Sequence, residues 1–200
     1  MRRWLRWIRI GLGAVVGLVV ILLAAVYTLS YAHLSRRYRI AQSPVTATSD
    51  SASLRWGEHR ATAIGKCQEC HGADLGGRLL VDNLQSGRLA APNLTSGRGG
   101  TGDWSDADWE RAIRHGVRRN GRPLLFMPAE AFAPMSDKDL AALVGYLRTV
   151  PPVDRELSSP RVGPVARTLF LFTAFPLVSA ELIDHSARPP APTRGPRKND

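Results

Sequence analysis

The sequence is poor in cysteine, and its first segment lacks acidic residues. Two cysteines among 200 residues exclude a small scaffold held together by several disulfides. Residues 1–40 carry seven arginines and no aspartate or glutamate, whereas residues 41–152 carry 13 basic and 12 acidic residues. Most of the formal net charge of +10 therefore lies outside the part expected to fold. This distribution argues against a nucleic-acid partner and indicates a membrane flank.

A long uncharged apolar run follows the first arginines. No charged side chain occurs in residues 10–32, and about 20 apolar residues in a helix cross a bilayer. Four arginines precede the run and three follow it, which weakly favours a cytoplasmic N-terminus. The alternative is a cleaved signal peptide, for which Ser30-Tyr31-Ala32 has the small-x-small pattern of a cleavage site. The uncharged run is, however, longer than the apolar region of a signal peptide. We predict a membrane anchor over residues 1–35 that spans the bilayer with residues 10–32, and a periplasmic location for the rest.

The remainder of the chain divides by composition into four segments. We predict a polar tether over residues 36–50 and the folded domain over residues 51–152. Residues 153–185 combine a proline-rich linker with a short apolar segment, and residues 186–200 are expected to be disordered. The apolar run at residues 168–180 is too short to span a bilayer, so it should pack on the domain or lie at the membrane surface.

Helical periodicity dominates the folded domain, and no convincing alternating strand pattern occurs, so the predicted fold is all-α. The first helix is expected over residues 51–69. A glycine-rich stretch, residues 72–103, follows it and is too long for an ordinary loop. We expect this stretch to wrap something large that is not protein.

Two further helices have clear start signals. Ser105 and Asp108 form a capping-box pattern, Trp104 and Trp109 fit a hydrophobic staple, and this helix should end near Gly116. The last helix should begin at Ser136 with a second box and staple and end before Pro151-Pro152. Its expected apolar face consists of Leu140, Leu143, Val144 and Leu147.

The chemistry-bearing motif is Cys67-Gln68-Glu69-Cys70-His71, a CxxCH sequence typical of c-type haem attachment. At a helix end its two thiols are spaced to meet two vinyl groups on one porphyrin edge, and the adjacent imidazole points at the iron. A thioredoxin-like CxxC needs a strand–helix context, and a structural zinc needs four ligands where the motif supplies three. A plain disulfide leaves His71 unexplained. We predict one covalent haem c with His71 as an iron ligand.

A second iron ligand is expected among the methionines and histidines. Met135 is expected to serve as the staple of the last helix. Met127 lies in an apolar loop before Pro128, which fixes the following backbone. His59 is expected to be solvated, and His115, which lies among arginines, to be at the surface. Met127 is therefore the predicted ligand.

Apolar residues near the motif are candidates for the haem pocket, although ordinary core packing explains each of them equally well. They are Ile64, Leu94, Trp104, Trp109, Ile113, Leu143 and Leu147. Five arginines between Arg111 and Arg122 form either a docking face for an acidic redox partner or a solvated helix face.

On these motifs, residues 51–150 resemble a class I c-type cytochrome, with an N-terminal helix, CxxCH, a wrapping loop, a methionine loop and a C-terminal helix. Gly57 and Tyr146 resemble the crossing of the first and last helices in that family. A closer resemblance is to membrane-anchored bacterial cytochromes that accompany dehydrogenases. It is carried by Ala91-Pro92-Asn93-Leu94-Thr95, Asp103-Trp104-Ser105-Asp106, Arg111-Ala112-Ile113-Arg114-His115-Gly116 and Met127-Pro128.

The resemblance implies roles for several residues. It implies that Met127 is the axial ligand and that Pro92, Asn93 and Leu94 line the histidine side of the haem. A backbone carbonyl in that stretch would hold the free nitrogen of His71. Relatives with the linker at residues 181–185 often continue into a second haem domain, whereas these 200 residues hold one CxxCH. The chain is thus either a one-haem protein or a shortened relative.

The function implied is a one-electron carrier without catalytic activity of its own. Its partners would be redox proteins, such as a dehydrogenase, an oxidase or another cytochrome, and the lipid bilayer. One alternative is a haem-based sensor or haem enzyme with a displaceable sixth ligand. Another is an assembly subunit whose haem is incidental.

Overall fold

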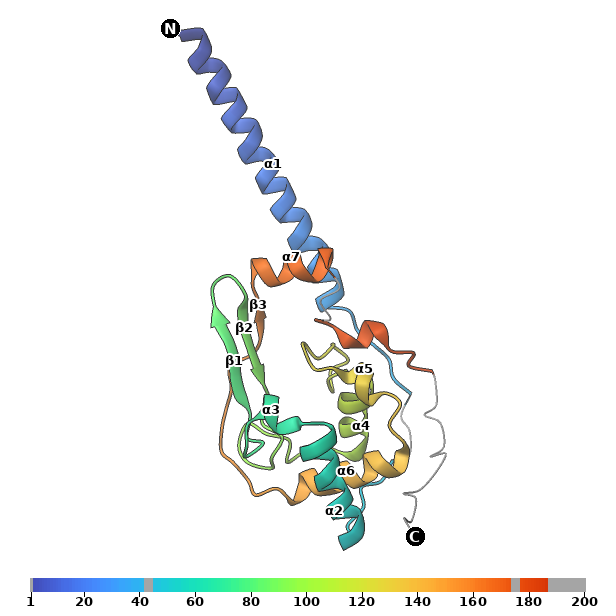
Figure 1. Cartoon of the computed structure of the whole chain (residues 1–200). Coiled ribbons are helices and arrows are strands. Elements are labelled where there is room, and N and C mark those ends of the chain that lie inside the picture. Colours follow the sequence, from blue (N-terminus) through green and yellow to red (C-terminus); the bar gives the residue numbers. More distant parts are fainter. Residues whose placement is uncertain (1, 42–44, 174–176, 187–200) are drawn as a thin grey trace.

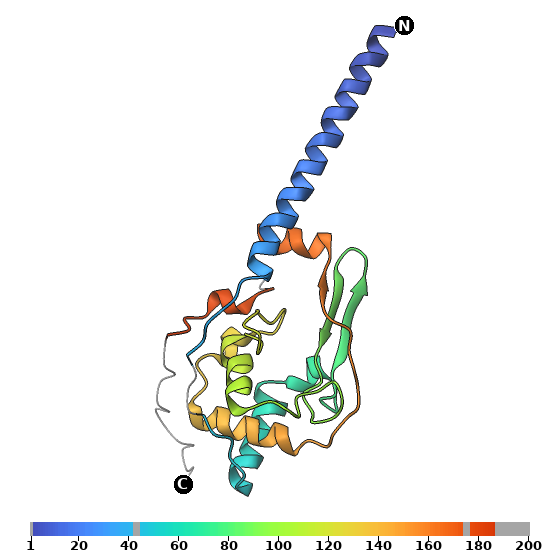
Figure 2. The ribbon, with the colours of Figure 1, turned by 180° about the vertical axis from the view of Figure 1, so that it is seen from behind.

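The computed structural model describes residues 2–41, 45–173 and 177–186 (Figure 1). Helix α1 (Arg2–Leu34) projects from the rest of the protein as a single rod (Figures 1 and 2). Residues 3–34 are long and apolar enough to cross a membrane, and none of their most apolar stretch is buried in the protein. A membrane anchor fits this helix, and a signal sequence would pass the same test of length and composition.

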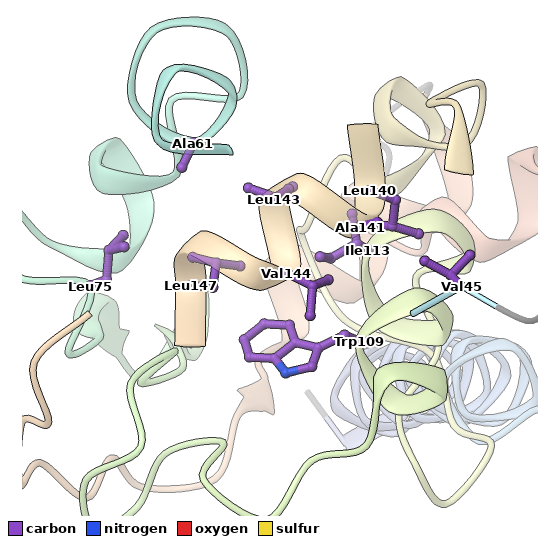
Figure 3. Close-up of a cluster of buried hydrophobic side chains, with 10 residues drawn as sticks. All are labelled: Val45, Ala61, Leu75, Trp109, Ile113, Leu140, Ala141, Leu143, Val144 and Leu147. Carbon is purple, nitrogen blue, oxygen red and sulfur yellow. The ribbon is translucent and has the colours of Figure 1, made fainter. Parts of the chain in front are cut away.

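The helical core forms where α2 (Ser51–His59) crosses α6 (Asp137–Thr149), with α4 (Asp106–His115) packed alongside. The crossing needs glycine at position 57, because a Cβ there would lie 2.0 Å from the carbonyl oxygen of Ala142. Figure 3 shows Leu143 and Leu147 of α6 between Ala61 on one side and Trp109 on the other. The predicted apolar face of the last helix is confirmed, since its four residues are all buried.

The prediction of one continuous helix over residues 51–69 is wrong. A π-helical turn, η1 (Arg60–Ile64), follows α2, and a separate one-turn helix, α3 (Cys67–His71), begins after a break. Lys66 at the break has a φ of 48°, in the left-handed region. Apolar spacing does not report such a break, because it follows from one backbone dihedral rather than from a change in pattern.

The fold is mostly helical, but the all-α prediction missed a small sheet. Strands β1 (Arg78–Asn83) and β2 (Gly87–Ala91) form an antiparallel hairpin, and β3 (Arg161–Val162) pairs with β2. The register shifts between Leu79 and Val81, and such a bulge interrupts the alternation that identifies a strand. The glycine-rich stretch at residues 72–103 is thus partly a hairpin rather than a structureless loop.

The predicted helix starts at Ser105 and Ser136 are confirmed. The α4 capping box is complete, the rings of Trp104 and Trp109 lie 5.1 Å apart, and Gly116 ends the helix with a φ of 63°. At α6, Ser136 accepts a hydrogen bond from the Asp139 backbone. The Asp139 carboxylate also accepts from Ser136 Oγ at 2.9 Å and from Trp56 Nε1 at 2.6 Å, and it pairs with Arg60. A short helix, α5 (Ala129–Phe132), was not anticipated.

The segments on either side of the domain pack onto it. Residues 45–50, which belong to the expected tether, contribute buried Val45 to the core, and Ala47 N donates to Asp106 Oδ2 at 2.9 Å. Helix α7 (Pro164–Phe172) crosses the end of α1 nearest the domain, and the 3-10 turn η2 (Ser179–Leu182) follows it. Residues 174–176, 42–44 and 187–200 lie outside the described residues, so the expectation of a disordered tail is not addressed.

Candidate functional site

Helix α3 places His71 against the loop that follows the hairpin. His71 is buried, and its Nδ1 lies 2.7 Å from the carbonyl oxygen of Pro92. A carbonyl only accepts hydrogen bonds, so Nδ1 carries the proton and donates, which leaves the lone pair on Nε2. Burial lowers the pKa of His71, and the Pro92 hydrogen bond opposes this shift. The imidazole is thus neutral at neutral pH, with one nitrogen ready for a metal.

Cys67 and Cys70 lie one helical turn apart on α3 as free, half-buried thiols. Burial raises the pKa of Cys67, and the neighbouring Cys70 thiol adds to the rise. Within the described ranges, no group of three or more His, Cys, Asp and Glu side chains is arranged to hold a metal ion. The zinc alternative therefore has no ligand cluster in that part of the chain.

A buried polar network fixes the loop that carries Pro92. The Asn93 side-chain oxygen accepts from Thr95 N and Oγ1, both at 2.8 Å, and its amide nitrogen donates to Val153 O at 2.7 Å. Thr95 Oγ1 accepts from Val153 N at 2.9 Å. Asn93, expected to line a pocket, thus has its polar atoms committed to backbone and to Thr95. Thr95 and Val153 were not predicted for the site, although Asn-x-Thr after a proline signals a side-chain-supported turn.

The methionine loop is held by a segment more than 50 residues further along the chain. Phe126 has a φ of 66°, and its N–H donates to Leu177 O at 2.8 Å. The carbonyl of Met127 accepts from Ser179 Oγ and from Ala129 N. The side chain of Met127 is half-buried against the core that Cys67 also contacts. Leu177 and Ser179 were not predicted, because no local pattern links the two segments.

Met135 is also half-buried against that core. Its carbonyl accepts from Arg114 Nη2 at 2.9 Å, which ties its backbone to α4. Burial against the core therefore does not distinguish Met127 from Met135. Met127 stays the predicted iron ligand because of its position before Pro128 and because of the resemblance.

Most residues expected around a haem lie together in one cluster. Trp109, Ile113, Leu143 and Leu147 are buried, whereas Leu94 and Trp104 are half-buried against them. Ile64, by contrast, is exposed. The donor set fits haem c, since two unbridged thiols and a neutral, oriented imidazole lie on one helical turn beside an apolar core.

The expectation that His115 lies at the surface is wrong. His115 is buried, and its Nδ1 lies 3.1 Å from Nδ1 of His185. Burial, then the charges of His185, Arg114 and Arg111, lowers the pKa of His115 to about 4. The partner histidine comes from the segment after α7, which sequence periodicity does not place on this domain.

The five arginines between residues 111 and 122 do not form one exposed face. Arg114 is buried, with Glu110 Oε1 and Asp137 Oδ1 each 2.8 Å away. Arg111 pairs with Asp108, and Arg119 pairs with Asp103 and Asp108. Three of the five charges are therefore neutralised within the domain, which removes the basis for a concentrated basic docking face.

Comparison with known proteins shows which proteins share these features. A nicotinate dehydrogenase subunit of Pseudomonas putida is 32% identical over 174 residues, which cover 81% of this chain and 14% of that protein. The gluconate 2-dehydrogenase cytochrome c subunit of Pantoea cypripedii is 36% identical over 49% of this chain and 23% of its own length. The fructose dehydrogenase cytochrome subunit of Gluconobacter japonicus is 30% identical over 56% of this chain and 24% of its own length.

The chain thus spans about a quarter or less of the length of these relatives. Residues 52–147 match the family model described as cytochrome c oxidase, cbb3-type, subunit III. These residues contain the CxxCH helix, the hairpin, the methionine loop and most of α6. Residues 52–147 thus form a c-type cytochrome domain similar to cbb3-type cytochrome c oxidase subunit III, and two of the relatives are cytochrome subunits of dehydrogenases.

Proposed function

We propose that this chain is a membrane-anchored, mono-haem c-type cytochrome that carries single electrons between a dehydrogenase and the respiratory chain. The observation that carries the proposal is the arrangement on α3. There a neutral His71, with Nδ1 committed to Pro92, lies on the same turn as two free thiols. The family of the domain and the dehydrogenase names of its relatives support an electron-transfer role.

Each residue has a defined task in this proposal. Cys67 and Cys70 would hold haem c through thioether bonds, and His71 Nε2 and Met127 would be the ligands of its iron. When bound, haem c supplies a one-electron iron couple. The hydrogen bond from His71 Nδ1 to Pro92 keeps the imidazole ring oriented. The buried core around Trp109 and Leu143 would exclude water from a bound haem and so favour its less charged, reduced form.

The proposed location is the bacterial cytoplasmic membrane, with the haem domain on the periplasmic side. The length and apolar composition of α1 support an anchor. The arginines before the apolar run favour a cytoplasmic N-terminus. The partners would be a dehydrogenase as electron donor and an oxidase or another cytochrome as acceptor.

The test is the oxidised optical spectrum of the full chain expressed with a c-type maturation system. We expect a weak far-red sulfur-to-iron band that Met127→Ala abolishes and Met135→Ala, the matched control, preserves. The intact mass should correspond to one haem per chain and show whether α1 is retained. Absence of the band with ready carbon monoxide binding would contradict the closed carrier and favour a sensor or enzyme.

A further inference from the structure

Helix α7 is fixed by one face to the domain-proximal end of α1. The two helices lie across one another there (Figures 1 and 2). The Arg167 guanidinium lies 4.7 Å from the centre of the Tyr27 ring, and its Nη1 donates to Ser30 Oγ at 2.7 Å. Phe170 packs edge-on against His33, with ring centres 5.6 Å apart. The contacts of α7 thus fall on Tyr27, Ser30 and His33, along one side of α1.

The opposite face of α7 is apolar and exposed. Val165, Leu169 and Phe172 expose 47%, 44% and 72% of their surface. Their helical spacing places them in one stripe. Thr168, beside them, has its hydroxyl bonded to Pro164 O at 2.9 Å, so it adds no unpaired donor. The one charged residue of α7, Arg167, points away from the stripe to α1. A helix on a water-exposed surface ordinarily turns its apolar residues towards the protein and its polar residues towards the solvent.

The level of α7 along α1 matches the edge of a membrane. The uncharged run of α1 ends at Ala32, and charge resumes at Arg36. Tyr27 and Tyr31 lie near the end of that run, where aromatic side chains gather at the boundary between hydrocarbon and headgroups. Because α7 contacts α1 between Tyr27 and His33, it lies at this boundary.

We infer that α7 is an interfacial helix that lies in the plane of the membrane surface, with Val165, Leu169 and Phe172 inserted among the acyl chains. The inference depends on the proposed anchoring by α1. Because α7 packs directly on α1, the lipid that surrounds α1 would also contact the exposed stripe of α7. Amphipathic helices of this kind bury their apolar face at the headgroup boundary. The haem domain then meets the membrane at two places.

The test uses single cysteines in the haem-loaded full chain in nanodiscs of phosphatidylcholine and phosphatidylglycerol. In the proposed holoprotein Cys67 and Cys70 would both be thioethers, so the introduced cysteine would supply the free thiol, and the intact mass checks this. Leu169→Cys and Phe172→Cys probe the stripe. Leu84→Cys, at an 81% exposed hairpin turn, is the water control, and Val15→Cys, 58% exposed on α1, is the lipid control. The rate of reaction with a charged, membrane-impermeant maleimide is measured by mass spectrometry.

We expect Leu169→Cys and Phe172→Cys to react at least about tenfold more slowly than Leu84→Cys, because thiolate formation is suppressed in lipid. If the stripe reacts as fast as Leu84→Cys while Val15→Cys stays slow, the inference on α7 fails and the anchor stands. If Val15→Cys also reacts fast, the proposed anchoring itself fails. An unchanged haem spectrum verifies that each variant is folded.

Slow reaction would also result if a protein covered the stripe. A carbene precursor dissolved in the bilayer separates the two cases on the unsubstituted holoprotein. Labelling of residues 165–172 supports contact with lipid. Labelling of α1 without labelling of α7 would mean that a second copy of the chain or a partner subunit covers the stripe, and it would overturn the inference.

Discussion

At the scale of the residue, the site depends on a few buried polar groups whose hydrogen bonds are satisfied by backbone. His71 was predicted as a ligand from CxxCH, and the resemblance implied that a carbonyl near Pro92 holds its free nitrogen. The structure identifies that carbonyl as the one of Pro92. Behind Pro92, Asn93 connects the loop to Val153 on the chain that follows α6. Loss of the Asn93 side chain would therefore have two effects. It would remove buried hydrogen bonds, and it would loosen the loop whose Pro92 carbonyl orients the His71 imidazole.

Asn93→Ala should therefore destabilise the domain and alter the haem environment. We expect a loss of roughly 2 to 3 kcal/mol in the free energy of unfolding, because buried partners lose their hydrogen bonds. The reduction potential should shift as well. Asn120→Ala, in an exposed turn, is the control and should change stability by under about 1 kcal/mol. Urea unfolding and redox titration measure both effects, and wild-type values for Asn93→Ala would contradict the role given to this network.

His115 gives the domain a specific acid sensitivity. Its native pKa of about 4 lies below the ordinary value of 6.5. The unfolded state therefore binds more protons between these values, and stability falls as the pH drops from 6.5 towards 4. The loss attributable to this residue is on the order of 3 kcal/mol at pH 4. Denaturation over this range should show a shallower loss in His115→Gln than in wild type, whereas exposed His59→Gln should follow wild type.

At the scale of the element, boundaries that depend on local caps were predictable, and those that depend on distant partners were not. Ser105 and Asp108 predict the start of α4 because a capping box is completed within four consecutive residues. The break before α3 depends on the dihedral of Lys66, and the hairpin is obscured by a bulge. The same contrast applies to the site, where the CxxCH motif is local but Ser179 reaches Met127 from a separate segment.

The crossing of α2 and α6 should not tolerate a side chain at position 57. A Cβ at Gly57 would lie 2.0 Å from Ala142 O and 2.9 Å from Tyr146 Cβ, so Gly57→Ala must push the two helices apart. We expect a loss of roughly 3 kcal/mol or more in stability, and reduced haem incorporation. Gly13→Ala, where no atom lies within 4 Å of the added Cβ, is the control. Equal thermal midpoints for the two variants would refute this close packing.

The segment containing Ser179 should act on the methionine loop rather than on global stability. Ser179→Ala removes the hydroxyl that donates to Met127 O, at a cost of about 1 kcal/mol. We expect the far-red band to weaken on warming at a lower temperature than in wild type. Ser179→Thr should restore it in part, and exposed Ser186→Ala should have no effect. Temperature-dependent spectra give the answer, and an unaltered band in Ser179→Ala would exclude a positioning role.

At the scale of the whole molecule, the folded unit is larger than the segment with helical periodicity. Val45, Val153 and Val178 all pack on or bond to residues of the domain from outside residues 51–152. Composition marked these flanks as tether and linker because they are short, rich in proline or polar, and carry no periodic pattern. Their contribution to the core depends on tertiary contacts with residues distant in the sequence, which a local pattern does not report.

A chain shortened to residues 51–152 should consequently mature poorly. We expect several-fold less haem-loaded protein than from residues 36–186, because the short form lacks Val45 and the hydrogen bonds that Val153 makes with Asn93 and Thr95. Haem staining against total protein measures the ratio. Equal yield and equal thermal midpoint from the two forms would restore residues 51–152 as the complete folding unit.

The packing of residues 45–50 also bears on how such a protein meets its partners. A cytochrome domain on a long flexible linker can move relative to its membrane anchor and so contact several partners in turn. Tyr38 N donates to Gly121 O, Val45 is buried and Thr48 N donates to Ala141 O, so the described residues on both sides of 42–44 are held on the domain. On the proposed membrane location, encounters then arise from lateral diffusion of the whole molecule or from permanent association. In the diffusive case, the turnover of the electron carrier would scale with the areal density of partners in the bilayer, whereas in a permanent complex it would not depend on that density.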